Sequence, residues 1–493
     1  MKIDVIRKLP EVLDTIFVLH HEDGDISKVE FLPGKIVSML TRVLNAESFT
    51  FKAGEIKSIY YSDPETHSRI FLIGVGKPEK LSASSLRTTF ANAIRQALKQ
   101  KSKTIYVFTG FDVPLTDVIY GHVISEAALM ASYKFDRYLP QENKHHIECV
   151  HLVIDTKNTR HINRGILEGR LYTEANFIAR NLVNEPANVL NPEYLAEQAK
   201  KTALHYGLSI EVHALDKIRR LKMEAFLAVA RGSVHEPRLI VMRYNGTNDH
   251  KSPVIGLIGK GLTYDSGGYC IKTPQGMLTM KDDMSGAAAV IGVMSAIANL
   301  KLKVNVTAVI AACENMISGE AYRPGDIIRA MNGKTIEVIN TDAEGRLTLI
   351  DAINYAIEKE NIAKIIDIAT LTGAAAAAVG PDYSVLISND KAWSKQLIEA
   401  GEATGELVWQ LPARDEYKEM LKSEIADLKN TGGPWGGAIT AGLFIREFVE
   451  NKPWMHIDIA GSAYREKEGG IYSFGATGVG VRMLIQLFRC MED

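Results

Sequence analysis

The sequence is poor in cysteine, in long apolar runs and in net charge. Its 4 cysteines are scattered through 493 residues without a C-x-x-C pair, so we expect free thiols in a reducing compartment. No apolar run approaches the roughly 18 residues that cross a membrane. Residues Met1–Lys8 lack the apolar segment of a signal peptide. We therefore expect a cytoplasmic protein with no membrane partner.

The charge balance gives no support to general nucleic-acid binding. Lys and Arg number 57 and Asp and Glu number 59, for a formal net charge of -2, whereas nucleic acids attract a basic excess. A local basic patch would still fit these totals. Hydrophobic residues make up 46% and charged residues 24%, which is typical of a soluble chain long enough for two or three domains.

The first third of the chain alternates apolar strands with amphipathic helices, which favours a small α/β domain over residues 1–158. The expected strands are Thr15–Leu19, Arg69–Ile73, Thr104–Phe108 and Val150–Ile154, and the expected helices are Ser85–Lys99 and Asp117–Tyr133. A polar stretch at 155–160 marks the end of this domain. We find no catalytic constellation in it.

A connecting segment, 159–185, leads to the larger domain. A helix is expected over Arg164–Val183, and Pro186 helps to end it because proline disfavours helix at the residue before it. Pro192 stands near the start of the next expected helix, Glu193–Tyr206, where proline is tolerated.

The remaining residues, 186–493, predict a second α/β domain with stronger strands. The expected strands are Arg238–Tyr244, Val254–Ile258, Val304–Ala311, Ile362–Ile368 and Trp454–Ile459, and the expected helices are Gly286–Leu300, Leu347–Lys359 and Ile439–Val449. Near-continuous apolar strands are typical of a sheet covered on both faces. The expected fold class is therefore α/β, with a small N-terminal domain and a larger C-terminal catalytic domain whose mixed, mostly parallel sheet carries helices on both faces.

The first of two polar segments follows the apolar run Val254–Ile258. We expect this run to form a strand that ends at Gly259. It reads GKGLTYDSGGYCIK over 259–272 and continues to two aspartates at 282–283. Its adjacent glycines, Gly267 and Gly268, would allow a close backbone approach. The glycines at its start do not form a P-loop, which needs four residues between glycines and Ser or Thr after the lysine.

The second polar segment reads NTDAEGRL over 340–347. Asp342 and Glu344 are two residues apart, so in an extended loop their side chains would face the same way. Arg346 would continue that row before a helix begins at Leu347. Paired carboxylates with nearby cations, on loops after buried strands, are what a metal-dependent hydrolase needs.

Both segments resemble the leucyl aminopeptidases, also called cytosol aminopeptidases, a family of two-metal exopeptidases. The resemblance covers the second half of the chain, in the segments Asn184–Asn191, Gly259–Lys272, Met280–Ala288, Cys313–Ser318, Pro324–Arg346, Ala369–Gly373 and Asp458–Gly461. Residues 340–347 are the family's signature octapeptide, unchanged. The first 150 residues resemble the family only in general character.

The resemblance implies five metal ligands and two catalytic residues. The implied ligands are Lys260, Asp265, Asp283, Asp342 and Glu344, with Asp265 and Glu344 bridging two ions, and the implied catalytic residues are Lys272 and Arg346. Residue chemistry supports this set, because four carboxylates balance two divalent cations. Without the resemblance, Lys260 would be interpreted as an ion-pair partner of Asp265, since a lysine amine binds metal only after losing its proton.

The resemblance also implies the cofactors and the reaction. Zinc is the family's expected metal, but a set of oxygen ligands and one amine also suits manganese, magnesium or cobalt. A hydroxide bridging the two metals would attack the first peptide carbonyl, and Lys272 would stabilise the oxyanion. Arg346 would hold a bicarbonate ion that passes the proton to the leaving amine.

The expected substrates are short peptides with a free N-terminus. The residues implied around the first side chain are Met280, Thr370, Ala460 and Ala463, and Leu371 and Gly373 would supply backbone contacts. An apolar pocket of this kind suits residues such as leucine, although Met280 fits ordinary core packing equally well. The family further implies a homohexamer whose active sites face an internal cavity.

Two other functions are compatible with the family. The first is a DNA-binding regulator that uses the same oligomer, with or without peptidase activity, and the second is an inactive scaffold, against which the complete set of seven residues argues. Several further polar residues are interpreted as structural or surface groups: Asp282, Glu314, Asp326, Asp351, Asp367 and His456.

Overall fold

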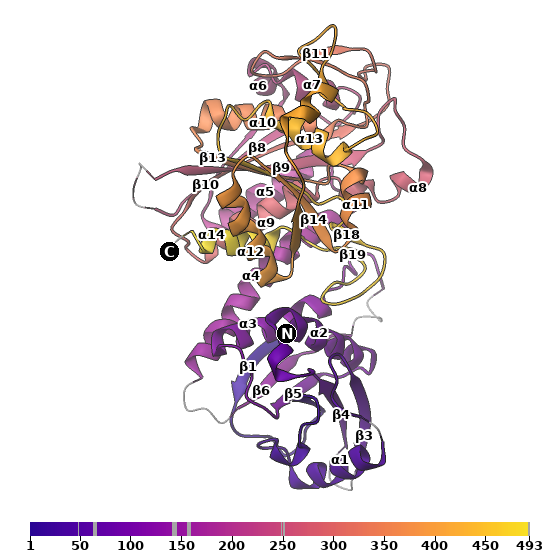
Figure 1. Ribbon diagram of the computed structural model, residues 1–493, viewed down its shortest axis with the longest axis vertical. Helices are drawn as coiled ribbons and strands as arrows, with labels where there is room; N and C mark the ends of the chain where they lie inside the picture. Colours follow the sequence, from indigo (N-terminus) through magenta and orange to yellow (C-terminus); the bar gives the residue numbers. More distant parts are fainter. Residues whose placement is uncertain are drawn as a thin grey trace. The chain divides into compact units, whose positions relative to one another are not determined.

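The computed structural model describes residues 1–47, 49–62, 67–140, 145–154, 159–247, 249 and 252–491 (Figure 1). The chain folds into two units, one of Met1–Thr173 with Lys467–Ser473 and the other of Glu174–Glu466 with Phe474–Asp493. Within the polar stretch expected to mark the domain boundary, residues 155–158 lie outside the described residues.

The first unit is built on a six-stranded sheet. Its strands lie in the order β1 (Lys2–Ile6), β6 (Cys149–Val153), β5 (Thr104–Thr109), β2 (Thr15–His20), β4 (His67–Gly74) and β3 (Ile56–Ser62). Neighbouring strands from β1 to β4 are parallel, and β3 is antiparallel on the edge. The four predicted strands are confirmed. The two edge strands, β1 and β3, were missed because their side chains are largely half-buried or exposed rather than apolar and buried.

The two predicted helices of this unit are confirmed as α2 (Ala83–Lys99) and α3 (Asp117–Ser132). A capping box starts α2, in which Ser82 and Ser85 each accept the other's backbone N–H. Phe90 of α2 packs edge-on against Phe17 of β2, with ring centroids 5.8 Å apart. The opposite face of the sheet carries a second apolar core that includes Ile36 and Leu40 of α1 (Gly34–Ala46).

The predicted connecting helix is α4 (Arg160–Asn184). Its C-terminal half carries buried polar side chains that hold a later part of the second unit. Asn176 donates to the carbonyl oxygens of Thr477 and Gly478, and Arg180 donates to that of Ala476.

The second unit is built on an eight-stranded mixed sheet. Its order is β15 (Leu407–Gln410), β14 (Tyr383–Ser388), β17 (Trp454–Asp458), β13 (Lys364–Ala369), β9 (Val254–Asp265), β10 (Asn305–Asn315), β8 (Arg238–Asn245) and β7 (Ser209–His213). The central strands β17, β13, β9 and β10 are mutually parallel, and antiparallel pairings join β14, β8 and β7 to them. The predicted mixed α/β sheet is confirmed.

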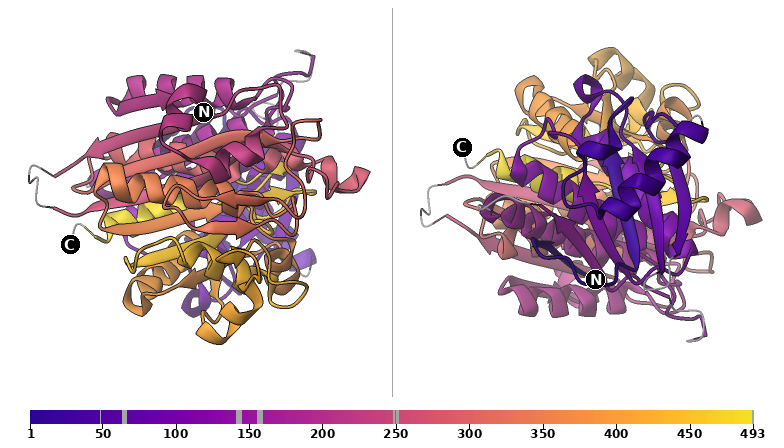
Figure 2. Two further views of the ribbon diagram at one scale, coloured as in Figure 1. Left: turned by 90° about the horizontal axis from the view of Figure 1, so that it is seen from above. Right: turned by 90° about the horizontal axis from the view of Figure 1, so that it is seen from below.

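Helices cover both faces of this sheet (Figure 2, left). One layer contains α5 (Pro192–Tyr206), α9 (Ser285–Asn299), α12 (Lys391–Thr404) and α14 (Val481–Arg489). The other contains α7 (Glu224–Ala230), α10 (Gly345–Glu360), α11 (Gly373–Val379) and α13 (Gly437–Arg446). Helix α9 can lie close to β9 because Gly259 has no side chain. A Cβ at this position would be 2.7 Å from the Cα of Ala287.

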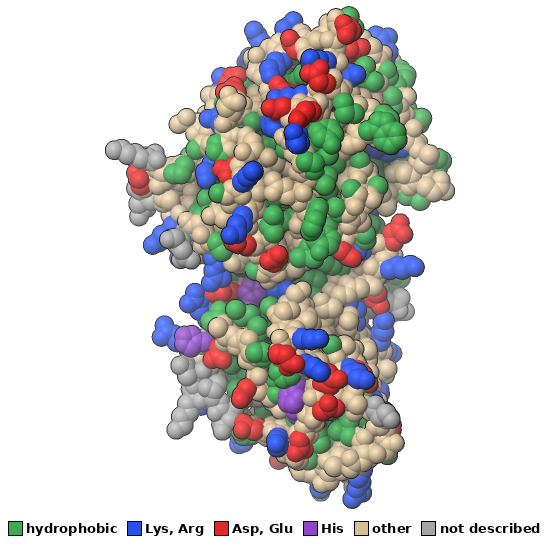
Figure 3. Space-filling model, in the orientation of Figure 1, with side chains coloured by type: hydrophobic (Ala, Val, Ile, Leu, Met, Phe, Trp, Pro, Cys, Tyr) green, Lys and Arg blue, Asp and Glu red, His purple; other side chains and the backbone are tan. Residues whose placement is uncertain are grey.

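Two surface properties bear on the expected partners. Among the described residues, the helices are too short or too polar to cross a membrane. On the face shown in Figure 3, the Lys and Arg side chains are interspersed with Asp and Glu side chains over each unit.

Candidate metal centre

Strand β9 carries two of the candidate ligands. The prediction that Gly259 ends this strand is wrong, because β9 continues to Asp265 in parallel pairing with β10. Lys260 and Asp265 are five residues apart, so regular alternation would turn their side chains to opposite faces. The register shifts by one residue between Cys313 and Glu314 of β10, and a bulge of this kind reverses the alternation beyond it. It thereby brings Lys260 and Asp265 to the same face.

The loop after β9 is fastened to the second polar segment. Gly267 and Gly268 have φ angles of +85° and +61°, in the left-handed region that glycine adopts most easily. The turn allows the Thr341 hydroxyl to donate to the carbonyl oxygen of Gly267 at 2.7 Å and to accept the backbone N–H of Cys270 at 2.8 Å. The close backbone approach predicted for the two glycines is therefore confirmed.

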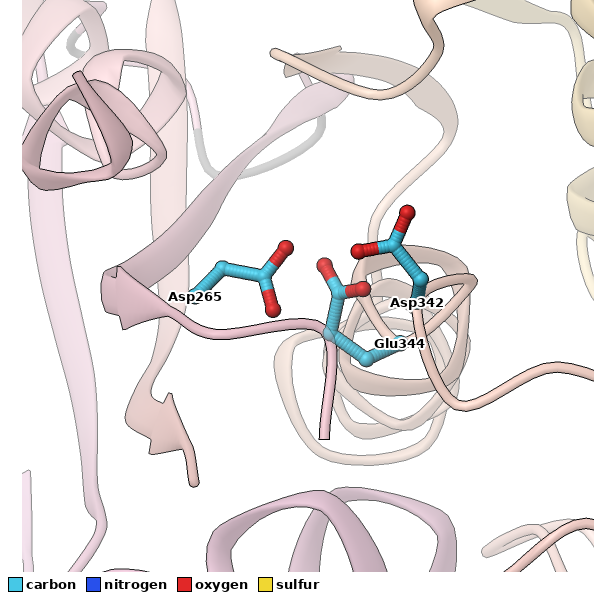
Figure 4. Close-up of side chains that lie close together, drawn as sticks. All are labelled: Asp265, Asp342 and Glu344. Atoms are coloured by element: carbon cyan, nitrogen blue, oxygen red, sulfur yellow. The ribbon is translucent and has the colours of Figure 1, made fainter. Parts of the chain in front are cut away.

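The second segment does not form the extended row that the sequence suggested. That expectation is wrong because Glu344 has helical backbone angles, φ -80° and ψ -35°, and α10 already begins at Gly345. The turn nevertheless brings Asp342 and Glu344 together with Asp265, so that one oxygen of each lies within 4.8 Å of the others (Figure 4). Asp265 comes from the end of β9, whereas Asp342 lies in the turn before α10 and Glu344 is the N-cap of that helix.

The amine of Lys260 lies among three acceptors. It is 2.7 Å from Asp283 Oδ1, 2.9 Å from Glu344 Oε1 and 2.9 Å from the carbonyl oxygen of Thr370. Three acceptors match the three protons of an ammonium group. Burial alone would lower the pKa of Lys260, but the carboxylates of Asp283 and Glu344 raise it well above its usual range. Lys260 would therefore have to lose a proton before binding a metal.

Gly345 makes room for this lysine. A Cβ at Gly345 would lie 2.3 Å from Cε of Lys260, well inside the van der Waals contact distance. The glycine of the octapeptide therefore positions a side chain that belongs to the other polar segment.

The ammonium of Lys272 bridges two of the acids. Its Nζ lies 2.8 Å from Asp265 Oδ2 and 2.5 Å from Asp342 Oδ1. Burial opposes its charge, but the carboxylates of Asp265, Glu344 and Asp342 raise the pKa of Lys272 above its usual range. Lys272 thus neutralises one pair of candidate ligands as Lys260 neutralises the other.

The donor set fits divalent cations. Asp283 Oδ2 and Glu344 Oε2 are buried and have no hydrogen-bond partner among the described residues, whereas buried acceptors in proteins are normally satisfied. Burial raises the pKa of Asp283, of Glu344 and of Asp342, so these acids cost free energy when they are ionised without a balancing cation. Carboxylate oxygens with one amine suit a hard or borderline metal ion.

Arg346 stands at the side of this centre with an unused donor. It is 6% exposed, and its Nη1 donates to the carbonyl oxygen of Asn430 at 2.8 Å. Its Nε–H is buried without a partner among the described residues. Burial lowers the pKa of Arg346 to about 10, which leaves it a cation at neutral pH. Its geometry suits an anion that accepts from Nε.

The candidate site lines a cavity of about 660 Å³. Its lining includes all seven predicted metal and catalytic residues, and five of the six residues predicted to bind substrate: Met280, Thr370, Leu371, Gly373 and Ala460. The sixth, Ala463, is 2% exposed and is not among the residues that line this cavity in the described part of the chain. The cavity lining therefore combines apolar residues such as Met280 and Ala460 with the charged residues of the candidate metal centre.

Most residues interpreted as structural have structural partners. Asp351 accepts the backbone N–H groups of Phe226 and Met331 at 2.9 and 2.8 Å. Asp367 accepts from Trp454 Nε1 at 2.6 Å and pairs with His456 Nδ1 at 2.5 Å. Glu314 accepts from the Ser233 hydroxyl, and Asp326 accepts the backbone N–H of Arg323. Asp282 differs, since it lies in the cavity wall and burial raises its pKa to about 7.

Three residues that position the site were missed from the sequence. Asn315 Nδ2 donates to Asp265 Oδ1 at 2.8 Å and to the Thr341 carbonyl at 3.0 Å. Asn430 Nδ2 donates to the carbonyl oxygen of Asn340 at 2.7 Å. Asp458 accepts the backbone N–H of Leu371 at 3.1 Å. Asn315 and Asp458 each end an apolar strand and lie in segments that resemble the family, which were the available signals, whereas Asn430 gave no signal.

Two family profiles match the sequence. Residues 177–485 match the catalytic domain of the cytosol aminopeptidase family, and residues 16–141 match the N-terminal domain of that family. A probable cytosol aminopeptidase of Clostridium perfringens is 48% identical over 448 residues, which cover 90% of each chain. One of Alkaliphilus oremlandii is 42% identical over 500 residues, covering 100% of both.

Solved structures show the same fold. The bottromycin maturation enzyme BotP, in complex with Mn, superposes with a TM-score of 0.85 at 28% sequence identity. The superposition covers 97% of this chain and 100% of that one. A second structure of BotP gives a TM-score of 0.83 at 28% sequence identity.

Proposed function

From the premise that the chain belongs to the cytosol aminopeptidase family, and is thus a metal-dependent aminopeptidase, we propose that the cavity at the end of β9 is its active site. The ligands we propose for two divalent ions are Lys260, Asp265, Asp283, Asp342 and Glu344. The observation that carries this assignment is the pair of buried carboxylate oxygens, on Asp283 and Glu344, that lack a hydrogen-bond donor.

The identity of the metal follows from ligand chemistry and from the relatives. Zinc remains the expected ion, and manganese has the support of the BotP structure, which was solved with Mn. Magnesium and cobalt also suit an oxygen-rich site. When bound, the ions polarise a carbonyl oxygen and lower the pKa of water, which is chemistry that the side chains alone do not supply.

The two catalytic residues have separate tasks in this proposal. Lys272 lies between the candidate ligands Asp265 and Asp342 and presents an ammonium to the cavity. It would donate to the carbonyl oxygen as negative charge develops there. Arg346 would hold bicarbonate through its unpartnered Nε–H, and this anion would carry the proton to the leaving amine.

The substrates are short peptides with a free N-terminus and, in our proposal, an apolar first residue such as leucine. Met280 and Ala460 would contact its side chain, with Thr370 at the same wall. The backbone of Leu371 and Gly373 would bind the peptide. Ala463 would act from behind this wall, since it is buried.

The remaining parts of the proposal concern organisation. We assign residues 1–158 to an N-terminal domain for oligomer contacts and substrate access, 159–185 to the connection, and 186–493 to the peptidase domain. The assembly is a cytoplasmic homohexamer. The alternative of a DNA-binding regulator is not favoured, because the family profile is that of a peptidase and the net charge is -2.

A matched pair of peptides tests this function. Purified protein with Mn²⁺ or Zn²⁺ should release leucine from Leu-Ala-Ala and should leave N-acetyl-Leu-Ala-Ala intact, because the free amine is part of what an aminopeptidase recognises. Release of acetyl-leucine at a comparable rate, or no hydrolysis of either peptide with either metal, would contradict the proposal.

A further inference from the structure

One acid in the wall of the active-site cavity has no cationic partner. Asp282 lines this cavity together with Met280 and Tyr464 and is 8% exposed. Among the described residues, none forms an ion pair with its carboxylate, and its backbone N–H donates to the carbonyl oxygen of Thr279 at 2.7 Å. A carboxylate so nearly buried is costly unless a cation or a set of donors satisfies it.

The lysines whose charges reach Asp282 are bound elsewhere. They are Lys260, Lys272 and Lys281. Lys260 is held by two acids and a carbonyl oxygen, and Lys272 by two further acids. Lys281 donates to the carbonyl oxygen of Asn184 at 2.7 Å. The charges of three lysines therefore reach this carboxylate, but their ammonium groups are hydrogen-bonded to other acceptors.

The surroundings of Asp282 suit a long side chain with a charged end. Met280 and Ala460 provide apolar walls, against which methylene groups can pack. A second acid, Glu466, also lines the cavity, and it is exposed and forms no ion pair among the described residues. The cavity lining therefore offers apolar groups to the stem of such a side chain and carboxylates to its charged end.

We propose that Asp282 is a specificity-determining residue that lets the pocket accept an N-terminal lysine or arginine in addition to apolar residues. The inference rests on the proposed function of this cavity. The carboxylate of Asp282 accepts a charge-assisted hydrogen bond from the substrate side chain. The same carboxylate repels a substrate that begins with glutamate or aspartate.

The test uses two substrates that differ by one charge. Lysyl and norleucyl amides have the same methylene stem, and the lysyl compound adds the ammonium. In wild-type protein we expect kcat/KM for the lysyl amide to be within about tenfold of that for the norleucyl amide. In Asp282→Asn the ratio of the two should fall by about 10- to 100-fold, as for the loss of one hydrogen bond to a charged group.

Two further variants separate a direct contact from other effects. Asp282→Glu keeps the charge and should restore part of the ratio, whereas a general disturbance of the site would lower it again. Glu466→Gln removes the exposed acid and should change the ratio by about threefold at most, because an exposed charge is screened by solvent. Metal content measured on each variant shows whether the neighbouring ligand Asp283 still binds.

Each outcome decides the matter. A wild-type protein that cleaves norleucyl amide more than about tenfold better than lysyl amide overturns the inference, even if the Asp282 variants fail to fold. So does a ratio that is unchanged in Asp282→Asn, or that falls as far in Glu466→Gln. Hydrolysis of neither amide by the wild type would instead refute the proposed function itself and the inference with it.

Discussion

Replacing Gly345 by alanine tests how the octapeptide positions a ligand that lies outside it. The new Cβ would be 2.3 Å from Cε of Lys260, and carbon atoms in contact are about 3.5 Å apart. The end of Lys260 would therefore have to move by about 1.2 Å. Its hydrogen bonds to Asp283, Glu344 and Thr370 are 2.7 to 2.9 Å long, so a shift of this size would stretch those it moves away from beyond the hydrogen-bond limit.

The expected result is a weaker metal site in a folded protein. Metal affinity should fall by about 10- to 100-fold, the usual effect of disturbing a residue that orients a metal ligand. The assay is a competition titration of metal-free protein with a chelator of known affinity. Gly34→Ala is the matched control, because Gly34 is also the first residue of a helix and has nothing within 4 Å of its Cβ position. Wild-type metal affinity in Gly345→Ala would refute the assignment of Lys260 as a ligand.

Further predictions concern the catalytic lysine, the pH dependence and the assembly. In Lys272→Ala, elemental analysis should find the metal still bound while kcat falls about 10²- to 10³-fold. Asp342→Ala should lose metal and activity together. Loss of metal from both variants would make Lys272 a ligand or a structural residue. Burial opposes the charge of His456, but Asp367 raises the pKa of this histidine above its usual value. The ion pair therefore stabilises the folded protein below about pH 6.5, and this stabilisation is lost as the pH rises through the raised pKa. The difference in Tm between wild type and His456→Gln should therefore narrow with rising pH, and a widening difference would contradict this sign. Light scattering should give about six times the 54.4 kDa chain mass, and a fully active monomer would contradict the proposed hexamer.

The sequence predicts most of the buried strands of the second unit because their apolar patterns are unambiguous, although it misses the buried strand β14. The central strands β9, β10 and β13 are buried along almost their whole length and were all predicted, although the ends of β9 and β10 were not. Short or half-exposed strands such as β7 and β15 carry no such pattern and were missed. The local sequence is enough to predict a buried central strand, whereas a short or half-exposed strand forms because it pairs with a neighbouring strand.

The candidate site shows the same division. The acids and lysines are visible in the sequence because their types and spacing match a known family. Their convergence is not visible, because it depends on the bulge in β9 and on the early start of α10. Asn430 contributes from a segment about 90 residues away from Asn340, and a single buried asparagine in a loop has no pattern of its own.

The central claim is that two divalent ions held by this cavity are required for aminopeptidase activity. Titrating metal-free protein with Mn²⁺ or Zn²⁺, while recording hydrolysis of leucyl amide and bound metal, tests it most directly. Activity should be negligible without metal and should reach a plateau once two ions are bound per chain. Full activity in protein shown by elemental analysis to be metal-free would contradict it.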